Sequence, residues 1–316
     1  MHLRPRLSVL AATAFAASLF STMSQAANIS VGTWAPLYQG IDFTTGTIDG
    51  ADASVGYALR INLAAAGIAF YTTPHGGSLN TVGETTSQFL ESSGAQLAIN
   101  ANFFSPCCNA SHEDKTVIGL AVSDGSVVAP ATATAGNSNV ALLLAHDNQA
   151  TITTTTASMD LSNVFNAVAG SAQIVQNGVN IGAQSPNEGD PPHPNPRTDA
   201  GISQNGQFLY LVTIDGRQNG YSAGTTITET ADMMMAFGAY NALNLDGGGS
   251  TVMVRSNGQG GAIDLNKPSG GTERYDADSL GVFALALPTP EPGTMGLGLG
   301  AIAIAMGLRF FRRARN

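Results

Sequence analysis

The sequence predicts an α+β fold: a single domain with a mixed, largely antiparallel β-sheet and a few flanking helices. Three observations indicate this class. Short apolar runs recur along the chain, glycine and Asp-Gly turn signals separate them, and only two segments look helical. The chain has 316 residues, of which 43% are hydrophobic and 11% are charged, so a sizeable core can be buried.

Strands are expected where short apolar runs end at turn residues. In chain order, these runs are residues 55–61, 67–72, 96–100, 117–123, 140–145, 208–215 and 242–245. The threonine run at 151–156 indicates an exposed strand or a linker. Residues 185–196 are rich in Pro, Asn, Asp and Gly, so no regular element is expected there.

Helices are expected at residues 84–93 and 228–239. Gly94 supplies a stop signal for the first. For the second, Thr228 is the expected cap, and Glu229 and Asp232 lie near the positive end of the helix.

The N-terminus, residues 1–27, is typical of a secretory signal peptide. Arg4 and Arg6 precede an apolar run at 7–20, and small residues end at Ala26. The alternative is an uncleaved anchor, although the apolar run is short for a membrane span.

The C-terminus, residues 288–316, carries three features in order: Pro290-Glu291-Pro292, an apolar stretch expected to span a membrane at 294–308, and an arginine-rich end. These features resemble the PEP-CTERM sorting signal of Gram-negative bacteria. The resemblance implies export, transient anchoring in the inner membrane and cleavage by an exosortase-type processing enzyme. The expected location is the periplasm, the outer envelope or the extracellular matrix.

The body between these ends is strongly acidic. Residues 28–290 contain seven Lys or Arg and 21 Asp or Glu, which gives a net charge of −14. Nucleic acid is therefore not expected as a partner, because binding a phosphate backbone requires a basic face.

The most informative segment is residues 244–251, Asn-Leu-Asp-Gly-Gly-Gly-Ser-Thr. An apolar run ends in Asp246, and three glycines and two hydroxyls follow. Consecutive glycines let a ligand approach the backbone, and their exposed N–H groups can form an anion-binding concavity. The alternative is a glycine-rich hairpin turn.

Four further polar segments accompany this one. The five are residues 100–104, 195–199, 213–217, 244–251 and 266–274. Together they resemble the phosphodiester glycosidase family, over about residues 95–285 of a domain expected to cover 28–287. The resemblance implies hydrolysis of a sugar-1-phosphodiester, of the N-acetylglucosamine-phosphate type, in extracellular or envelope glycans.

Cations gather in these segments despite the acidic background. Four of the seven, Arg197, Arg217, Lys267 and Arg274, lie in or beside them. Because the guanidinium fork binds phosphate at two points, we expect a phosphate clamp. The alternative for each arginine is an ordinary salt bridge.

Asp215 and Asp246 are the catalytic candidates, since each ends an apolar strand at a glycine. Neighbouring strand ends would bring them to one rim, where one acts as nucleophile or as base. The alternative is that one of them caps its own loop. The substrate-binding candidates are Asn100, Asn102, Arg197, Thr198, Arg217, Gly247, Gly248, Gly249, Ser250, Thr251, Asn266 and Arg274.

No cofactor is assigned. The loop Asp and Asn residues leave Ca²⁺ open, with no ligands named. The adjacent Cys107 and Cys108 are either a strained bonded pair or two thiols. Two other functions stay open: a non-catalytic protein that binds exopolysaccharide matrix, and a phosphodiesterase that cuts the phosphorus side.

Overall fold

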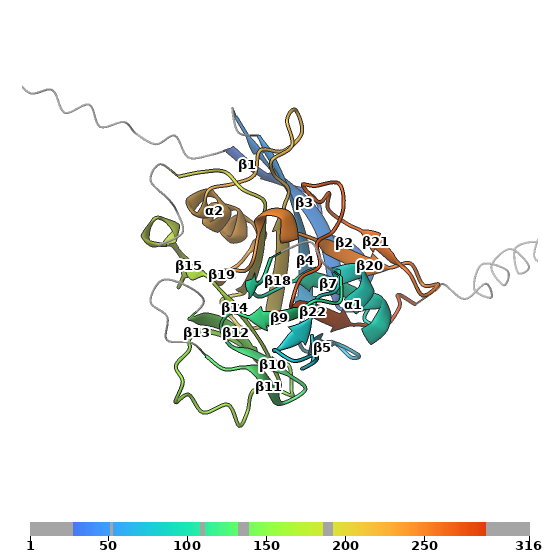
Figure 1. Cartoon of the computed structure of the whole chain (residues 1–316). Coiled ribbons are helices and arrows are strands. Elements are labelled where there is room, and N and C mark those ends of the chain that lie inside the picture. The colour runs from blue at the N-terminus through green and yellow to red at the C-terminus, as the bar shows by residue number, and fades with distance from the viewer. Residues whose placement is uncertain (1–27, 51–52, 108–110, 132–138, 186–191, 289–316) are drawn as a thin grey trace, which may run out of the picture.

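The computed structural model describes residues 28–50, 53–107, 111–131, 139–185 and 192–288 (Figure 1). The predicted signal peptide and nearly all of the predicted sorting tail, including the span at 294–308, lie outside these ranges.

The described ranges contain no helix that is long and apolar enough to cross a bilayer. The longest helix there, α2 (Ile227–Phe237), has 11 residues. The predicted location depended on a membrane anchor. Because no such span is supported, we correct that prediction and do not carry it further.

The largest layer is a nine-stranded sheet in the order β1-β3-β4-β18-β17-β19-β15-β16, with β2 paired to β3. Its strands are β1 (Asn28–Val31), β2 (Ala35–Tyr38), β3 (Ile41–Asp49), β4 (Ser54–Asn62), β15 (Ala172–Gln176), β16 (Val179–Asn180), β17 (Arg197–Ile202), β18 (Phe208–Ile214) and β19 (Asn241–Asn244).

Three smaller sheets lie against this layer. One is β21-β20-β7-β22-β5, one is β11-β10-β14-β12-β13, and the smallest is β6-β9-β8. Their strands are β5 (Ala69–Thr72), β6 (Thr81–Val82), β7 (Leu97–Asn100), β8 (Phe104–Ser105), β9 (Asp114–Val117), β10 (Ala121–Ser123), β11 (Ser126–Ala129), β12 (Val140–Leu144), β13 (Ala150–Thr154), β14 (Asn166–Gly170), β20 (Met253–Ser256), β21 (Ala262–Asp264) and β22 (Ser279–Phe283).

Two α-helices occur in the described ranges, and both begin with a capping box. Thr85 and Gln88 cap α1 (Thr86–Ser93), and Thr226 and Glu229 cap α2. Each helix stops at a glycine in the left-handed conformation. Short 3₁₀ turns form at Gly182–Gln184 (η1) and Gly248–Ser250 (η2).

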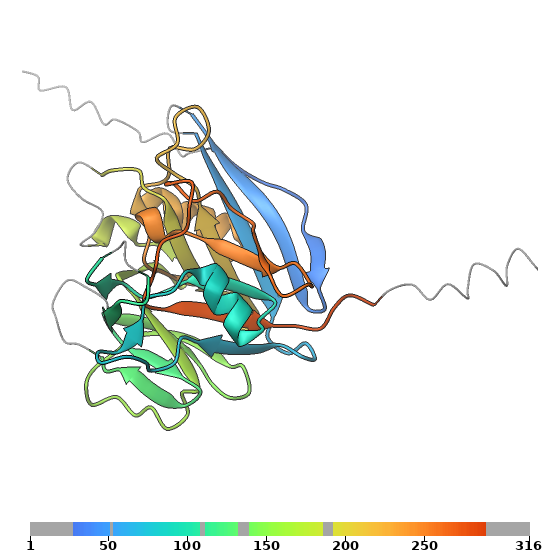
Figure 2. The same ribbon diagram turned by 45° about the vertical axis from the view of Figure 1, so that its right-hand side comes forward.

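The core lies between the sheets. Ile61, Leu211 and Leu245 of the large sheet and its edge pack against Ile99 of β7 and Leu142 of β12, all fully buried or nearly so. The other face of the large sheet is covered by α2, and the outer face of the β7 sheet is covered by α1 (Figure 2). Burial of this apolar surface holds the layers together.

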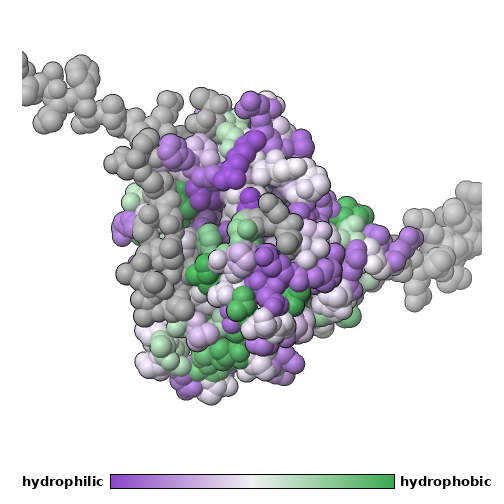
Figure 3. Space-filling model, in the orientation of Figure 1, coloured by the Kyte–Doolittle hydropathy of each residue, from purple (hydrophilic) through white to green (hydrophobic). Residues whose placement is uncertain are grey.

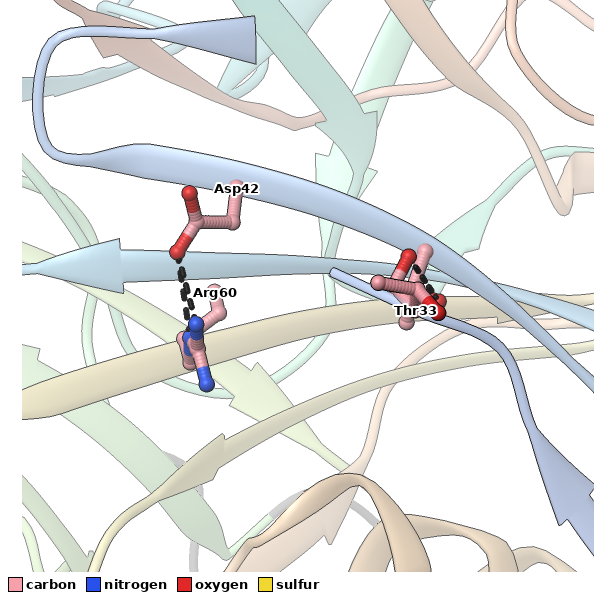
Figure 4. Close-up of polar contacts among 4 residues, drawn as sticks. Thr33, Asp42 and Arg60 are labelled. Atoms are coloured by element: carbon pink, nitrogen blue, oxygen red, sulfur yellow. Dashed lines mark hydrogen bonds and ion pairs between the residues drawn. The ribbon is translucent and has the colours of Figure 1, made fainter. Parts of the chain in front are cut away.

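The hairpin of β3 and β4 is fixed by a cross-strand ion pair. Arg60 donates to Asp42 Oδ2 at 2.8 Å, directly across the ladder (Figure 4). The Arg60 guanidinium also lies 4.7 Å from the centre of the Trp34 ring. One cation outside the predicted site therefore has its own structural role.

The strand pairings within the described residues are antiparallel, which confirms the predicted largely antiparallel sheet. Only two α-helices occur in the described ranges, so the predicted α+β class is corrected to a β-rich fold. The predicted strand at 117–123 is also wrong: the chain turns at Gly119, where φ is +88°, and forms β9 and β10 instead. The second helix begins at Ile227, one residue earlier than predicted, because Thr226 and not Thr228 is its N-cap.

We predict that Leu245→Ala lowers the free energy of unfolding by about 2–5 kcal/mol, because it opens a cavity in the core directly behind Asp246. Urea denaturation measures the change. The matched control is Leu79→Ala, since Leu79 is 45% exposed; its effect is expected within about 0.5 kcal/mol. Equal effects of the two substitutions would contradict the packing described here.

Candidate active site

Six strand ends meet at one edge of the molecule. In the large sheet, β17 lies between β18 and β19 and is antiparallel to both, so β18 and β19 run in the same direction. Asp215 and Asp246 therefore leave the sheet at the same edge, with Arg197 at the start of β17 between them. In the facing sheet, the end of β7 and the starts of β20 and β22 reach the same place.

Asn100, at the end of β7, joins the two sheets. Its Nδ2 donates to the carbonyl oxygen of Asp246 at 2.7 Å. Its Oδ1 accepts from Thr198 Oγ1 at 2.6 Å and from Val252 N–H at 3.1 Å. The Asp246 N–H completes the connection by donating to the Ala101 carbonyl at 2.9 Å. Asp246 is thus fixed to both sheets through its backbone.

The Asp246 side chain is only partly exposed and carries an altered acidity. Burial raises the pKa of Asp246 to about 7, although the Ser250 hydroxyl, the Gly247 N–H and the charge of Arg274 act in the opposite direction. The Gly247 N–H donates to Asp246 Oδ1 at 2.9 Å. A carboxyl group whose pKa lies near neutrality can gain or lose a proton during a reaction at that pH.

Residues 247–249, which we call the glycine bend, pass close beneath two arginines. Gly248 has φ +67° and donates to the Pro196 carbonyl at 2.9 Å. A Cβ at Gly248 would lie 3.2 Å from Arg217 Nη2, and a Cβ at Gly249 would overlap the guanidinium of Arg274. Glycine is required here because the backbone and the guanidinium groups are in contact.

These two arginines have no acidic partner. Within the described part of the chain, neither Arg217 nor Arg274 forms an ion pair. Two bonds to Asn195 Oδ1, at 2.8 and 3.2 Å, orient the Arg217 guanidinium, and the backbone of Arg217 is left-handed with φ +59°. Unpaired guanidinium groups in an acidic protein form a local positive site suited to an anion.

A hollow of about 340 Å³ opens beside Arg274. It is lined by Gly249, Ser269, Gly270, Thr272, Glu273, Arg274 and Tyr275. Hydrophilic side chains predominate over the upper and central parts of the face in Figure 3, and a hydrophobic area lies lower. Arg274 also lies near Cys107, which is disulfide-bonded: the distance from Arg274 Nη1 to Cys107 Sγ is 3.9 Å.

Asp215 is held differently from Asp246. Its carboxylate is buried and accepts from Asn266 Nδ2 at 2.9 Å, from Lys267 N–H at 3.0 Å and from Tyr221 Oη at 3.1 Å. Burial raises the pKa of Asp215, and these hydrogen bonds oppose the rise. The side chain therefore ties the loop after β18 to the loop after β21.

Two of the predicted binding residues do not reach this cluster. Asn102 is buried and donates to the carbonyls of Ile118 and Leu120, which fixes the turn before β10. Arg197 donates to the Thr225 carbonyl at 2.9 Å, and its charge acts on Asp199. Because Arg197 shares a strand face with Asp199, its guanidinium lies on the α2 side of the sheet.

The remaining predicted residues support the site from below. Thr198 is bonded to Asn100, and Thr251 accepts from Asn266 through its carbonyl at 3.3 Å. Asn266 Oδ1 also accepts from the Met253 N–H at 2.7 Å. Ser250 is buried, and its hydroxyl lies beside Asp246.

The match to a family model decides the relationship of this chain. Residues 93–283, more than half of the chain, match the phosphodiester glycosidase model. The chain belongs to the phosphodiester glycosidase family. The matched range contains every strand end that meets at the site. No curated protein sequence is significantly similar to this chain.

Several solved structures share the fold. A protein from Burkholderia pseudomallei described as exported has a TM-score of 0.63 at 16% identity, covering 82% of this chain and 97% of its own. The zebrafish N-acetylglucosamine-1-phosphodiester alpha-N-acetylglucosaminidase catalytic domain, auto-inhibited by its pro-peptide, has 0.58 at 17%, covering 82% and 88%. A hypothetical protein from Synechocystis has 0.57 at 14%; the match covers 79% of this chain and 64% of that longer one. The TM-scores show that these proteins share the fold of this chain.

Two groups at this site were not predicted from the sequence. Asn195, which orients Arg217, lies in a segment in which only Arg197 and Thr198 were predicted to bind substrate. Asp276 is buried beside Asp246, whose charge raises its pKa, and no prediction included it. The sequence does contain one indication of its role: Asp276 and Asp278 stand directly before an apolar run, whereas Asp246 stands directly after one.

No group of three or more metal-ligating side chains gathers among the residues that the structure describes. The donor set around Asp246 instead combines carboxyls with guanidinium groups, which repel cations. No ligands for Ca²⁺ are therefore assigned.

We predict that Gly249→Ala lowers kcat/KM at least 10-fold while changing the melting temperature little. The new methyl group displaces the flexible Arg274 side chain, and φ at this position is compatible with alanine. Combining Gly249→Ala with Arg274→Ala should add little to the loss from Arg274→Ala alone. Fully additive losses would show that the two residues act independently.

Proposed function

We propose that this chain hydrolyses the bond between the anomeric carbon of a sugar and a phosphodiester. The observation that carries the proposal is the position of Asp246 at the start of the glycine bend, against which lie two guanidinium groups that form no ion pair within the described part of the chain. Membership of the phosphodiester glycosidase family supports this class of reaction.

The phosphate is assigned to Arg217 and Arg274. Both side chains lie against the glycine bend, where the absence of Cβ atoms lets the guanidinium groups approach the backbone. Cleavage leaves a phosphate monoester that carries one more negative charge than the diester. Fixed cations stabilise that developing charge without reorganising during the reaction.

Asp246 is assigned the role of general base. In this step, its carboxylate takes a proton from water, and the water oxygen attacks the anomeric carbon. The bond from that carbon to the phosphate oxygen breaks, and its electron pair stays on the phosphate. A pKa of about 7 suits a base at neutral pH, and direct attack by water inverts the anomeric configuration.

The sugar is proposed to be an N-acetylglucosamine-type residue. This assignment follows the zebrafish catalytic domain of the same fold, whose substrate linkage is part of its name. The hollow beside Arg274, with its hydroxyl, backbone and tyrosine groups, supplies the polar lining that a pyranose requires.

Residues 28–287 are proposed to act as one domain. The N-terminal strand β4 pairs with β18, and β3 pairs with β4, so the part of the chain before the family match completes the sheet that carries Asp215. The same apolar core includes Ile41 and Leu245. Removing residues before 93 would therefore leave that core open.

The first test is turnover of a synthetic N-acetylglucosamine-1-phosphodiester by the full chain. We predict release of free sugar, with oxygen from labelled water at the anomeric carbon and an inverted anomer as the first product. Arg274→Ala should lower kcat/KM about 10²-fold or more. Arg255→Ala is the matched control. Arg255 lies opposite Leu97, farther along β20 from the strand start that reaches the site, so its substitution should leave the rate unchanged.

The products separate this function from its rivals. Sugar phosphate as the first product would assign the cut to the phosphorus side, as in a phosphodiesterase. Binding of glycans without turnover, insensitive to Asp246→Asn, would assign the chain to the non-catalytic matrix-binding class.

The second test is the pH dependence of kcat/KM. Asp246 must be ionised to accept a proton, so the rate should rise as the pH increases toward about 7. Asp246→Asn should lower kcat/KM about 10²–10⁴-fold, with the thermal unfolding midpoint retained. A rate that stays constant from pH 5 to pH 8 would contradict the assigned role.

A further inference from the structure

Asp276 is a buried carboxyl group that the mechanism above does not use. It precedes β22 and is 2% exposed. Its backbone is fixed by a mutual pair of hydrogen bonds with Glu84, at 2.9 and 3.2 Å. Neither carboxyl oxygen has a hydrogen-bond partner among the residues that the structure describes.

Two other buried carboxyls near the site do accept hydrogen bonds, whereas Asp199, on the α2 side of β17, shares with Asp276 the lack of a partner among the described residues. Asp215 accepts four hydrogen bonds, and Asp278 accepts one from the Thr73 N–H at 3.3 Å. A carboxylate that only supports a loop accepts such bonds. An ionised carboxylate that is buried without donors is strongly unfavourable, so the neutral acid is the stable form of Asp276.

The groups that face Asp276 indicate what its proton does. Asp246 is close enough for its charge to raise the pKa of Asp276, and Glu273 adds to the rise. The Ser250 hydroxyl and the Arg274 guanidinium act in the opposite direction. Ser250 is buried and acts on Asp246 in the same way, so its hydroxyl lies near both carboxyls.

We propose that Asp276 is a positioning residue that keeps its proton while Asp246 is ionised, so that the buried pair carries one negative charge and Asp246 holds it. The protonated acid can donate to Ser250 Oγ, and the Ser250 hydroxyl can donate in turn to Asp246. This chain gives partners to two buried oxygens that have none otherwise, Ser250 Oγ and the protonated oxygen of Asp276.

The consequence for the rate rests on the proposed function. When Asp276 loses its proton, a second negative charge appears behind Asp246 and the donor to Ser250 disappears. The Asp246 carboxylate is then repelled and loses its orientation. The pH profile of kcat/KM should therefore be a bell, with its acid limb from Asp246 and its alkaline limb from Asp276.

The test compares Asp276→Asn with the wild type over the full pH range. Asparagine is neutral at every pH and keeps an N–H donor, so we expect folded Asp276→Asn to retain the acid limb and to lose the alkaline limb. Ser250→Ala should move the acid limb to higher pH, because the Asp246 carboxylate loses a stabilising donor.

Two matched controls should keep both limbs. Asp278→Asn changes an equally buried carboxyl two residues away, whose neighbours are Thr73 and Glu84. Tyr221→Phe removes the phenol that donates to Asp215. The proposal is overturned when Asp276→Asn keeps the alkaline limb, when it folds but is inactive at every pH, or when Tyr221→Phe removes that limb.

A measurement without substrate separates this inference from the proposed function. In the full chain labelled with ¹³C at aspartate carboxyls, the Asp276 signal is assigned by its loss in Asp276→Glu, which retains a carboxyl even where asparagine prevents folding. The expected result is a protonated Asp276 at pH values where Asp246 is ionised, and a lower Asp276 pKa in Asp246→Asn. An Asp276 signal that titrates below that of Asp246 would overturn the proposal, whatever the protein hydrolyses.

Discussion

The site depends on one buried asparagine that connects two sheets. Asn100 lies at the end of a fully buried strand, and its amide contacts Asp246, Thr198 and Val252, each from a different strand end. An amide supplies both a donor and an acceptor, so no apolar residue could make these contacts. Because the groups from Thr198 and Val252 are buried, losing the amide would leave them without partners. The sheets, and with them the Asp246 carboxyl, are therefore held in one arrangement.

Charge is distributed unevenly around this junction. The body is acidic, and two cations away from the site are paired: Arg60 with Asp42, and the buried Lys115 with Glu113 at 2.7 Å. At the glycine bend, Arg217 and Arg274 lie against the backbone and form no ion pair among the described residues. An anionic ligand would supply the negative charge that pairs with these two guanidinium groups. Steric freedom at the glycines and unpaired charge at the arginines are thus two parts of one binding surface.

The sequence predicted the strands that end at the site because each is a short apolar run that stops at a polar residue, as at Asn100, Asp215 and Asp246. It did not predict β17, since Arg197-Thr198-Asp199 looks like a loop until its neighbours on both sides are known. For the same reason the side of the sheet on which Arg197 lies was not predictable. Asp276 was not predicted because its distinguishing property is burial near Asp246. The two residues are far apart in the sequence, so the sequence does not show that they lie near each other.

We propose that Asp246 and two guanidinium groups surround one phosphorylated sugar. The most direct measurement is a crystal structure of full-chain Asp246→Asn with an N-acetylglucosamine-1-phosphodiester bound. We expect phosphate oxygens in contact with Arg217 and Arg274 above the glycine bend, and the anomeric carbon facing residue 246. A ligand bound with its phosphate away from both guanidinium groups, or bound elsewhere on the protein, would contradict it.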